Sequence, residues 1–163
     1  RALSEDGVPV VIGAGEPGAA EGLDAPAVEQ RIRTQRAAFL AEASRGLPWA
    51  PPADPRMQAG QQRGARLWQQ RLGQLNLACA QCHDQHAGAK LGGATIPQAH
   101  PTGYPIYRLE WQGLGSLQRR LRGCFAGVRA EVPPFEHADL VALELHLMQR
   151  AAGLPLETPA VRP

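Results

Sequence analysis

The sequence is poor in several features that usually indicate a class of function. Basic and acidic residues nearly balance, at 17 and 15, so no extended field for nucleic acid or a charged membrane surface is expected. No apolar run approaches the roughly 20 residues that a membrane-spanning helix needs. Aromatic residues make up only 5% of the chain, against 18 glycines and 15 prolines. This composition favours long loops between few helices, with a core that side chains alone fill poorly.

Cysteine is also scarce, and two of the three cysteines stand in one motif. Cys79-Ala80-Gln81-Cys82-His83 is a C-x-x-C-H sequence, the attachment site of a c-type haem. Two thiols at this spacing can each add to one haem vinyl group, and the histidine that follows can bind the iron. Zinc would need more ligands at paired spacing, and a redox pair would not explain His83. The motif therefore predicts one covalently attached haem c.

The third cysteine, Cys124, has no partner within the chain. Covalent haem is attached outside the cytoplasm in bacteria, so we expect a mature periplasmic or otherwise exported protein. In an oxidising compartment, a leftover cysteine either pairs with another chain or is a thiol with a task.

Arginines surround Cys124 in the sequence, at positions 119, 120, 122 and 129. Guanidinium groups lower a thiol pKa and favour the thiolate, which is the nucleophilic and iron-binding form. The same groups can hold a sulfur oxyanion through two hydrogen bonds. The alternative is an inert, buried cysteine beside a solvated basic helix face.

The ligand opposite His83 on the iron decides the chemistry. The candidates downstream of the motif are His86, His100, Cys124, His137, His146 and Met148. His86 is too close in sequence to reach the opposite face easily, and lone histidines such as His137 and His146 are more often surface residues. Met148 fits an apolar helical stripe and therefore the core. Cys124 is the preferred distal ligand, and His100, in a loop, is its rival.

Four segments carry helical signals. They are residues 27–44, 55–72, 116–122 and 136–152. Asp54 and Ser116 are expected to cap the second and third of these helices. Trp68 is expected to face the haem or the last helix. Residues 1–26, 47–55 and 88–104 have the composition of loops.

One repeat is visible. Gly46-Leu47-Pro48 recurs as Gly153-Leu154-Pro155, 107 residues later, and flanking leucine and Pro-Ala pairs recur at the same offset. Many helices end in glycine and proline, but the shared offset favours a duplication. We therefore expect residues 1–53 to be the C-terminal part of a first cytochrome c-like domain, whose start is missing, plus a linker. Residues 54–163 are expected to form the haem-binding cytochrome c domain.

Four parts of the sequence resemble the SoxA family, the cytochrome subunits of bacterial thiosulfate-oxidising systems. They are residues 73–84, 100–112, 119–131 without 125 and 126, and 159–163. The family has two cytochrome-like domains, in agreement with the repeat. The resemblance implies that Cys79 and Cys82 hold the haem and that His83 is the proximal ligand.

The resemblance also implies that Cys124 is the distal, reactive ligand, often found as a persulfide, and that Arg120 is the family's active-site arginine. It implies pairing with a small cytochrome, SoxX, and a reaction that joins thiosulfate oxidatively to a cysteine of the carrier SoxYZ. An intact first domain does not fit in residues 1–53.

We predict a mainly α-helical, class I cytochrome c-like domain that acts as a sulfur transferase, with electrons leaving through haem. Two other interpretations stay open. A simple electron-transfer cytochrome, with His83 opposite His100 or Met148, would need no thiol. A haem sensor or binding module would have a readily displaced sixth ligand and no turnover.

Overall fold

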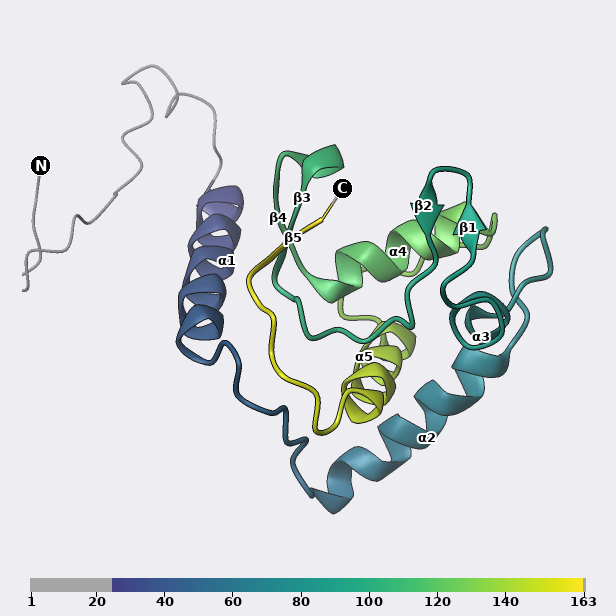
Figure 1. The fold of residues 1–163 in the computed structure, drawn as a ribbon, viewed down its shortest axis with the longest axis horizontal. Coiled ribbons are helices and arrows are strands. Elements are labelled where there is room, and N and C mark those ends of the chain that lie inside the picture. Colours follow the sequence, from purple (N-terminus) through teal and green to yellow (C-terminus); the bar gives the residue numbers. More distant parts are fainter. Residues whose placement is uncertain (1–24, 163) are drawn as a thin grey trace, which may run out of the picture. The chain divides into compact units, whose positions relative to one another are not determined.

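The computed structural model describes residues 25–162 (Figure 1). Residues 34–163 form one compact unit, and residues 1–33 form another, of which only the beginning of the first helix is described. Of the loop expected over residues 1–26, only Ala25 and Pro26 lie within the described part, and both are helical.

Helix α1 spans Ala25–Ala43 and confirms the helix predicted over residues 27–44. Shortly after its end, Gly46 takes a φ of 82°, a left-handed conformation that suits glycine. Large apolar side chains lie open on this helix, since Phe39 is 76% exposed and Leu40 is 65% exposed. Helix α1 therefore offers apolar surface that does not belong to the core described next.

Helices α2 (Pro55–Gln69) and α5 (Ala138–Arg150) pack across each other (Figure 1). Asp54 caps α2 as predicted, and its carboxylate accepts the backbone N–H of Arg56 at 2.9 Å. The two backbones come close, because a Cβ added to Gly64 would stand 2.0 Å from the carbonyl oxygen of Ala142. Glycine at this position therefore sets the distance between the two helices.

The core forms around this crossing. Leu140, Leu143 and Leu147, the predicted stripe of the last helix, are 0%, 1% and 1% exposed. Trp68 of α2 is 2% exposed and packs with them, as do Leu121 and Phe125 of a further helix. The expectation that Trp68 faces the last helix is confirmed.

A tight turn separates α2 from the short helix α3 (Cys79–His83). Helix α2 ends at Gln69 and not at the expected residue 72, because Leu72 pairs with Leu77 across this turn. Gly73 has a φ of 66°, and a Cβ on it would stand 2.1 Å from the carbonyl oxygen of Val128. The turn is thereby held against the chain that follows Cys124.

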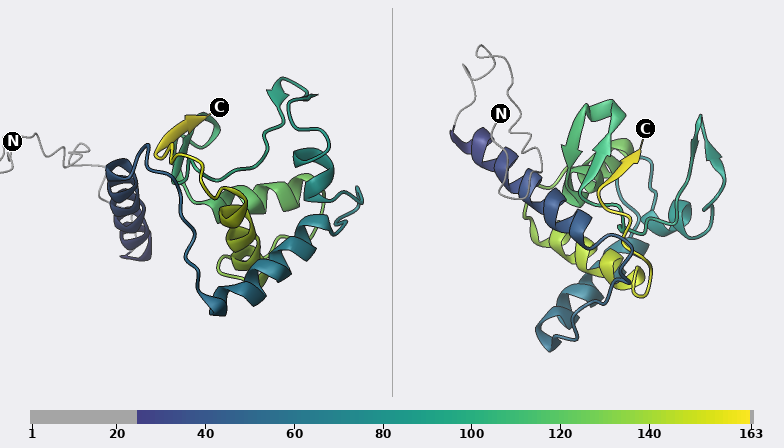
Figure 2. Two further views of the ribbon diagram at one scale, coloured as in Figure 1. Left: turned by 60° about the horizontal axis from the view of Figure 1, so that its bottom comes forward. Right: turned by 60° about the vertical axis from the view of Figure 1, so that its left-hand side comes forward.

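The segment after α3 is mostly loop, as predicted, but it contains one short hairpin. Strands β1 (Lys90–Leu91) and β2 (Ala94–Thr95) pair in antiparallel register. Their hairpin projects from the rest of residues 34–162 in both views of Figure 2. Two-residue strands carry too little alternation to be recognised in a sequence.

Three more short strands form a small sheet. Strand β3 (Ile106–Arg108) pairs antiparallel with β4 (Gly113–Gly115) and parallel with β5 (Ala160–Arg162). A 3₁₀ turn, η1 (Leu109–Trp111), connects β3 to β4. No strand was predicted here, because three residues cannot show a clear two-residue period.

Helix α4 (Leu117–Gly127) begins where the sequence predicts and ends later. The Ser116 hydroxyl oxygen accepts the backbone N–H of Arg119 at 3.2 Å, which confirms the predicted cap. The helix was expected to stop at residue 122, but it continues through Gly123 and so carries Cys124 on its face. A glycine inside a helix weakens the helix without necessarily ending it.

The two Gly-Leu-Pro segments bind each other, and we call residues 46–49 with 153–156 the clasp. The N–H of Gly46 donates to the carbonyl of Leu156 at 2.8 Å, and the N–H of Gly153 donates to the carbonyl of Trp49 at 2.8 Å. A second pair of bonds between these segments, at 2.8 and 2.9 Å, is related in the same way. Each bond maps onto its counterpart when the 107-residue offset is applied. Residues 47–54 contain no helix and no strand longer than one isolated bridge, as expected of a linker, and the first of them are held by the clasp.

The described residues are mainly helical, in agreement with the predicted class. Between residues 25 and 162, no helix has both the length and the apolar character needed to cross a membrane.

Candidate functional site

Cys79, Cys82 and His83 lie on the single turn of α3. The start of this turn is held by Gln81, whose side-chain oxygen accepts the backbone N–H of Ala78 at 2.8 Å. Residues three apart share a face of a helix, so the two thiols point in a similar direction. Both cysteines are half-buried and neither is in a disulfide. The turn thus presents two free thiols and an imidazole together.

A backbone contact orients the imidazole of His83. Its Nδ1 lies 2.7 Å from the carbonyl oxygen of Pro97. Because a carbonyl only accepts hydrogen bonds, this contact assigns the proton to Nδ1. Nε2 then keeps its lone pair, the form in which a neutral histidine binds a metal.

A polar network ties α3 to both core helices. The indole Nε1 of Trp68 donates to Asp84 at 2.8 Å, and the guanidinium of Arg150 donates to the other oxygen of that carboxylate at 2.7 Å. Arg150 also stacks on the Trp68 ring, 4.8 Å from its centroid, and Trp68 lies 5.7 Å from the ring of His83. These contacts anchor Asp84, the residue that follows the motif, to α2 and α5, so the motif is fixed to the two core helices.

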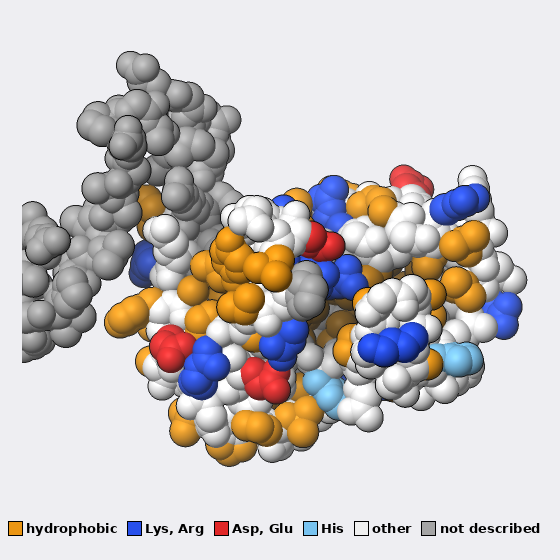
Figure 3. Space-filling model, turned by 45° about the horizontal axis from the view of Figure 1, so that its top comes forward, with side chains coloured by type: hydrophobic (Ala, Val, Ile, Leu, Met, Phe, Trp, Pro, Cys, Tyr) orange, Lys and Arg blue, Asp and Glu red, His pale blue; other side chains and the backbone are white. Residues whose placement is uncertain are grey.

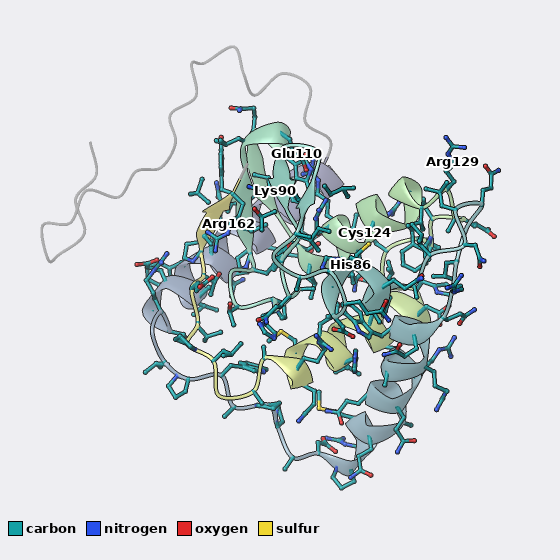
Figure 4. All side chains as sticks on the ribbon, turned by 45° about the vertical axis from the view of Figure 1, so that its right-hand side comes forward. His86, Lys90, Glu110, Cys124, Arg129 and Arg162 are labelled. Carbon is teal, nitrogen blue, oxygen red and sulfur yellow. The ribbon has the colours of Figure 1, made fainter. Side chains whose placement is uncertain are left out.

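Cys124 projects from α4 toward the interior, half-buried (Figure 4). Burial, and after it the charge of the nearby Cys124, raise the pKa of the Cys79 thiol to about 11. Cys82 in turn raises the pKa of Cys124. Cys124 follows Cys82 by 42 residues in sequence, yet the three thiols of α3 and α4 share one site.

The arginines do not make Cys124 acidic by themselves. Burial raises the pKa of the Cys124 thiol, while Arg120 and Arg108 lower it by a smaller amount. Arg120 lowers the pKa of Cys124, as the sequence predicts for an arginine beside this cysteine, but desolvation raises the pKa by more. A metal cation bonded to the sulfur would favour the thiolate in such a buried place.

The arginines near Cys124 in sequence separate in space. Arg119 stacks on Trp111 at 4.4 Å, and Arg122 stacks on Phe135 at 4.3 Å. Arg129 is exposed and lies well away from Cys124 in Figure 4. Among these four, the structure brings only Arg120 to the cysteine, the arginine that helical spacing places one turn before Cys124.

No protein-family model matches the chain. Among curated proteins, it is 40% identical over 110 residues to the L-cysteine S-thiosulfotransferase subunit SoxA of Pseudaminobacter salicylatoxidans, which is 68% of this chain and 38% of that protein. It is 39% identical over 130 residues to the subunit of the same name from Allochromatium vinosum, covering 77% and 46% of the two chains. Among solved structures, one chain in the crystal structure of SoxXA from P. pantotrophus matches with a TM-score of 0.76 and 31% identity, over 80% of this chain and 49% of that one.

The chain is thus a relative of the SoxA proteins over the part that aligns. It spans less than half the length of the two SoxA proteins just named, 38% and 46%. The match to the solved SoxXA chain likewise covers about half of that chain, 49%.

The residues of α3 fit a c-type haem, as expected for a SoxA relative. Two thiols free of disulfide bonds stand at the spacing needed for thioether attachment, and the imidazole of His83 keeps Nε2 for iron. Cys79, Cys82 and His83 are therefore the residues that would hold the group.

The other proposed axial ligands have different surroundings. The Nδ1 of His86 contacts the carbonyl oxygen of Gln81, within the same stretch of chain as the motif. His137 caps α5 at the surface, where its Nδ1 accepts the backbone N–H of Asp139 at 3.2 Å. His146 was expected at the surface, but it is half-buried: its ring packs on Trp68 at 5.9 Å, and its Nε2 is buried. Half-buried His100 lies in the loop before β3 and stays the alternative to Cys124 for a SoxA-like site.

Two residues of the site escaped the sequence analysis. Arg108, on β3, is the second cation that lowers the pKa of Cys124. Burial raises the pKa of the Tyr104 hydroxyl. Arg120 and Arg108 lower this pKa, and the charge of Cys124 raises it, so the hydroxyl lies near the same arginines and the same thiol. Both residues lie in the segment 100–112 that resembles SoxA, but no local pattern distinguishes them, since only the fold brings β3 to α4.

Proposed function

We propose that the protein is a haem c sulfur transferase that couples thiosulfate to a cysteine of a SoxYZ-like carrier. The observation that carries this proposal is the position of Cys124, on α4, beside the C-x-x-C-H turn and Arg120. A plain electron carrier has no use for a half-buried thiol beside an arginine at this place. The names of the curated SoxA relatives support the same chemistry.

Cys79 and Cys82 would hold one haem c through thioether bonds, and the side chains of His83 and Cys124 would bind its iron. When bound, the haem supplies an outlet for the electrons that sulfur oxidation releases. The protein contributes an imidazole oriented by the Pro97 carbonyl and a thiol carried by α4.

The reaction forms one S–S bond at the expense of two electrons. The Cys124 thiolate and the outer sulfur of thiosulfate would join as Cys124–S–S–SO₃⁻, with both electrons leaving. A thiolate of the carrier then attacks the outer sulfur, and Cys124 departs as a thiolate. Arg120 would hold the sulfonate oxygens, because a planar guanidinium donates two hydrogen bonds to such an oxyanion and keeps its charge.

We further propose that residues 1–53 are the C-terminal part of a first cytochrome c-like domain and its linker. The clasp supports this, because its hydrogen bonds repeat under the same 107-residue offset as the sequence. Gly46 and Gly153 also share one backbone conformation, with φ values of 82° and 80°. An internal duplication explains why two helices end in the same way and meet.

The proposed partner is a small SoxX-like cytochrome, and the proposed compartment is the periplasm. The solved relative is a SoxXA structure, which supports the first. Attachment of haem c outside the cytoplasm supports the second.

A Cys124→Ser variant tests the proposed function. We expect haem to stay attached, because Cys79 and Cys82 are intact, whereas thiosulfate-dependent cytochrome reduction with the carrier present is lost. The EPR g-values of the oxidised protein should change as well, because the proposed sulfur ligand of the iron is removed. Ala126→Ser, at an exposed position on the same helix, serves as the control. Unchanged g-values and full electron exchange in Cys124→Ser would favour a simple electron carrier, with His100 as first choice of ligand.

A further inference from the structure

Arg108 has an unusual place for an arginine, at the end of β3 with its side chain only 16% exposed. Two residues earlier, Ile106 pairs with Ala160 of β5, and both are buried, at 5% and 6%. Side chains two apart in a strand share a face. Arg108 therefore points to the inner side of the sheet, and its register partner Arg162 lies beside it.

Trp111 brings this strand end to the helix that carries Cys124. The Arg108 guanidinium lies 5.3 Å from the centroid of the Trp111 ring, and the Arg119 guanidinium lies 4.4 Å from it. Arg119 is in the first turn of α4, and Arg120 is the next residue. Stacking on a single ring thus holds the end of β3 close to the start of α4.

The contacts of Arg108 leave most of its hydrogen-bonding capacity unused. Its Nε lies 2.8 Å from a carboxylate oxygen of Glu110, but the angle does not make a hydrogen bond, and this Nε is buried. Glu110 is itself half-exposed, at 50%. Within residues 25–162, neither Arg108 nor Arg120 donates a hydrogen bond through its side chain. The N–H groups of both guanidinium groups are therefore available to a ligand.

Arg108, Arg120 and Arg162 all lower the pKa of Tyr104, so the three guanidinium groups lie close to this side chain. Cations this close together repel one another. Arg162 is offset by Glu157, at 2.9 Å. On the face shown in Figure 3, basic side chains are mixed with acidic, polar and apolar ones, so the described surface there has no broad basic field. A local concentration of cations at one thiol, against that mixed surface, is a site for an anion.

We propose that Arg108 is a second substrate-binding residue, which holds the sulfonate end of thiosulfate together with Arg120 while the outer sulfur reaches Cys124. This rests on the proposed function, because it names how the same site takes its substrate. Two guanidinium groups, one from β3 and one from α4, can each bind a different pair of sulfonate oxygens. A doubly charged anion between them would also relieve their repulsion.

The test uses the haem-loaded, full-length protein with its partner cytochrome. Thiosulfate binding is measured by calorimetry with carrier and electron acceptor left out, and KM and kcat are measured with both present. We expect Arg108→Gln to raise Kd and KM about tenfold, the loss of a charge-assisted hydrogen bond, with a smaller change in kcat. Arg108→Lys should recover part of this loss. Arg119→Gln is the matched control, because it removes the other cation from the Trp111 ring.

Each outcome separates the two proposals. If the wild-type protein reduces cytochrome with thiosulfate while Arg108→Gln keeps its Kd and KM within twofold, Arg108 is not a binding residue and the proposed function stands. Equal weakening in Arg108→Gln and Arg119→Gln would show loss of Trp111 packing, which also overturns the assignment. If the wild-type complex neither binds nor oxidises thiosulfate, the proposed function falls and this inference falls with it.

Discussion

At the scale of single residues, the partner of each arginine decides what it can do. Arg119 and Arg122 each cover an aromatic ring, and Arg150 is bound by Asp84. Arg120 has no ion-pair partner within residues 25–162, although it stands next to Arg119 in the chain. An arginine without a protein partner, one helical turn before a buried thiol, is free to bind a substrate anion.

Replacing Arg120 should therefore affect turnover far more than replacing its neighbours. We expect Arg120→Ala to raise the barrier by about 2 to 4 kcal/mol, if its guanidinium stabilises charge that develops in the reaction. Arg120→Lys should recover only part, because an ammonium lacks the planar fork. The measurement is thiosulfate-dependent cytochrome reduction in the presence of the carrier.

Arg119→Ala and Arg122→Ala are the matched controls, and both should keep most of the turnover. Equal losses at positions 119, 120 and 122 would indicate a general basic surface in place of one oriented arginine. No loss at Arg120 would remove this residue from the mechanism.

His146 should make the stability of the fold depend on pH. Burial lowers the pKa of His146 below its ordinary value of 6.5, Arg150 lowers it further, and Asp84 opposes them. The folded state thus binds fewer protons than the unfolded state in the interval below pH 6.5. The stability that neutral His146 contributes is fully present above pH 6.5. It is lost as the pH drops from 6.5 toward the lower pKa of His146 in the folded state.

Urea titrations of the wild-type protein and His146→Gln at several pH values check this prediction. The variant, which cannot take up a proton here, should lose stability less steeply below pH 6.5. Parallel curves for the two proteins would mean that the pH dependence arises from other groups.

At the scale of elements, the crossing of α2 and α5 governs the site, because Asp84 is anchored to both helices. Gly64 permits this crossing, and at Gly60 an added Cβ would stand 2.6 Å from a side-chain carbon of Leu145. The obstacle at Gly60 is the end of a flexible side chain, whereas the obstacle at Gly64 is backbone, which cannot move aside. The two glycines should therefore differ in how well they tolerate substitution.

Gly64→Ala should lower the free energy of unfolding by about 1 to 3 kcal/mol or more, the range of overpacked cores. Gly60→Ala should cost less. Gly123→Ala is the control, because nothing lies within 4 Å of an added Cβ there, and alanine should stabilise the helix by about 0.5 to 1 kcal/mol. Chemical denaturation of the three variants gives the comparison. A stability of Gly64→Ala equal to that of the wild type would mean that the helices are further apart in solution.

At the scale of the whole molecule, apolar surface on α1 needs explanation. Ile32, Phe39 and Leu40 are 49%, 76% and 65% exposed. Exposed apolar groups at this density on one helix indicate contact with further protein. The remainder of a first cytochrome-like domain and a SoxX-like cytochrome are the covers that the proposed function supplies.

We therefore expect the native protein to be isolated as a complex. Analytical ultracentrifugation of untagged protein from its source should give the mass of this chain, in its full length, plus that of a small cytochrome. A Phe39→Asp variant should weaken the complex if α1 lies in the interface, whereas Val141→Asp, at a 39% exposed position on α5, is the control. A single species with the mass of the chain alone would contradict the expectation.

The sequence by itself determined the features that depend on neighbouring residues. The C-x-x-C-H spacing places two thiols and an imidazole within five residues, and the structure carries all three on the single turn of α3. Asp54 and Ser116 predict the starts of two helices, because a cap acts within three residues of its own position. The leucine stripe predicts the buried face of α5, because a helical period of 3.6 residues is a local property.

Only the tertiary structure decided what meets at Cys124. Arg108 reaches the site because β3 ends beside the start of α4, and strands of three residues leave no periodic signal in the sequence. Arg119 and Arg122 leave the site because Trp111 and Phe135 bind them, and neither contact can be read from adjacent positions alone. The clasp likewise joins residues about 107 positions apart, where backbone hydrogen bonds depend on how the whole chain folds.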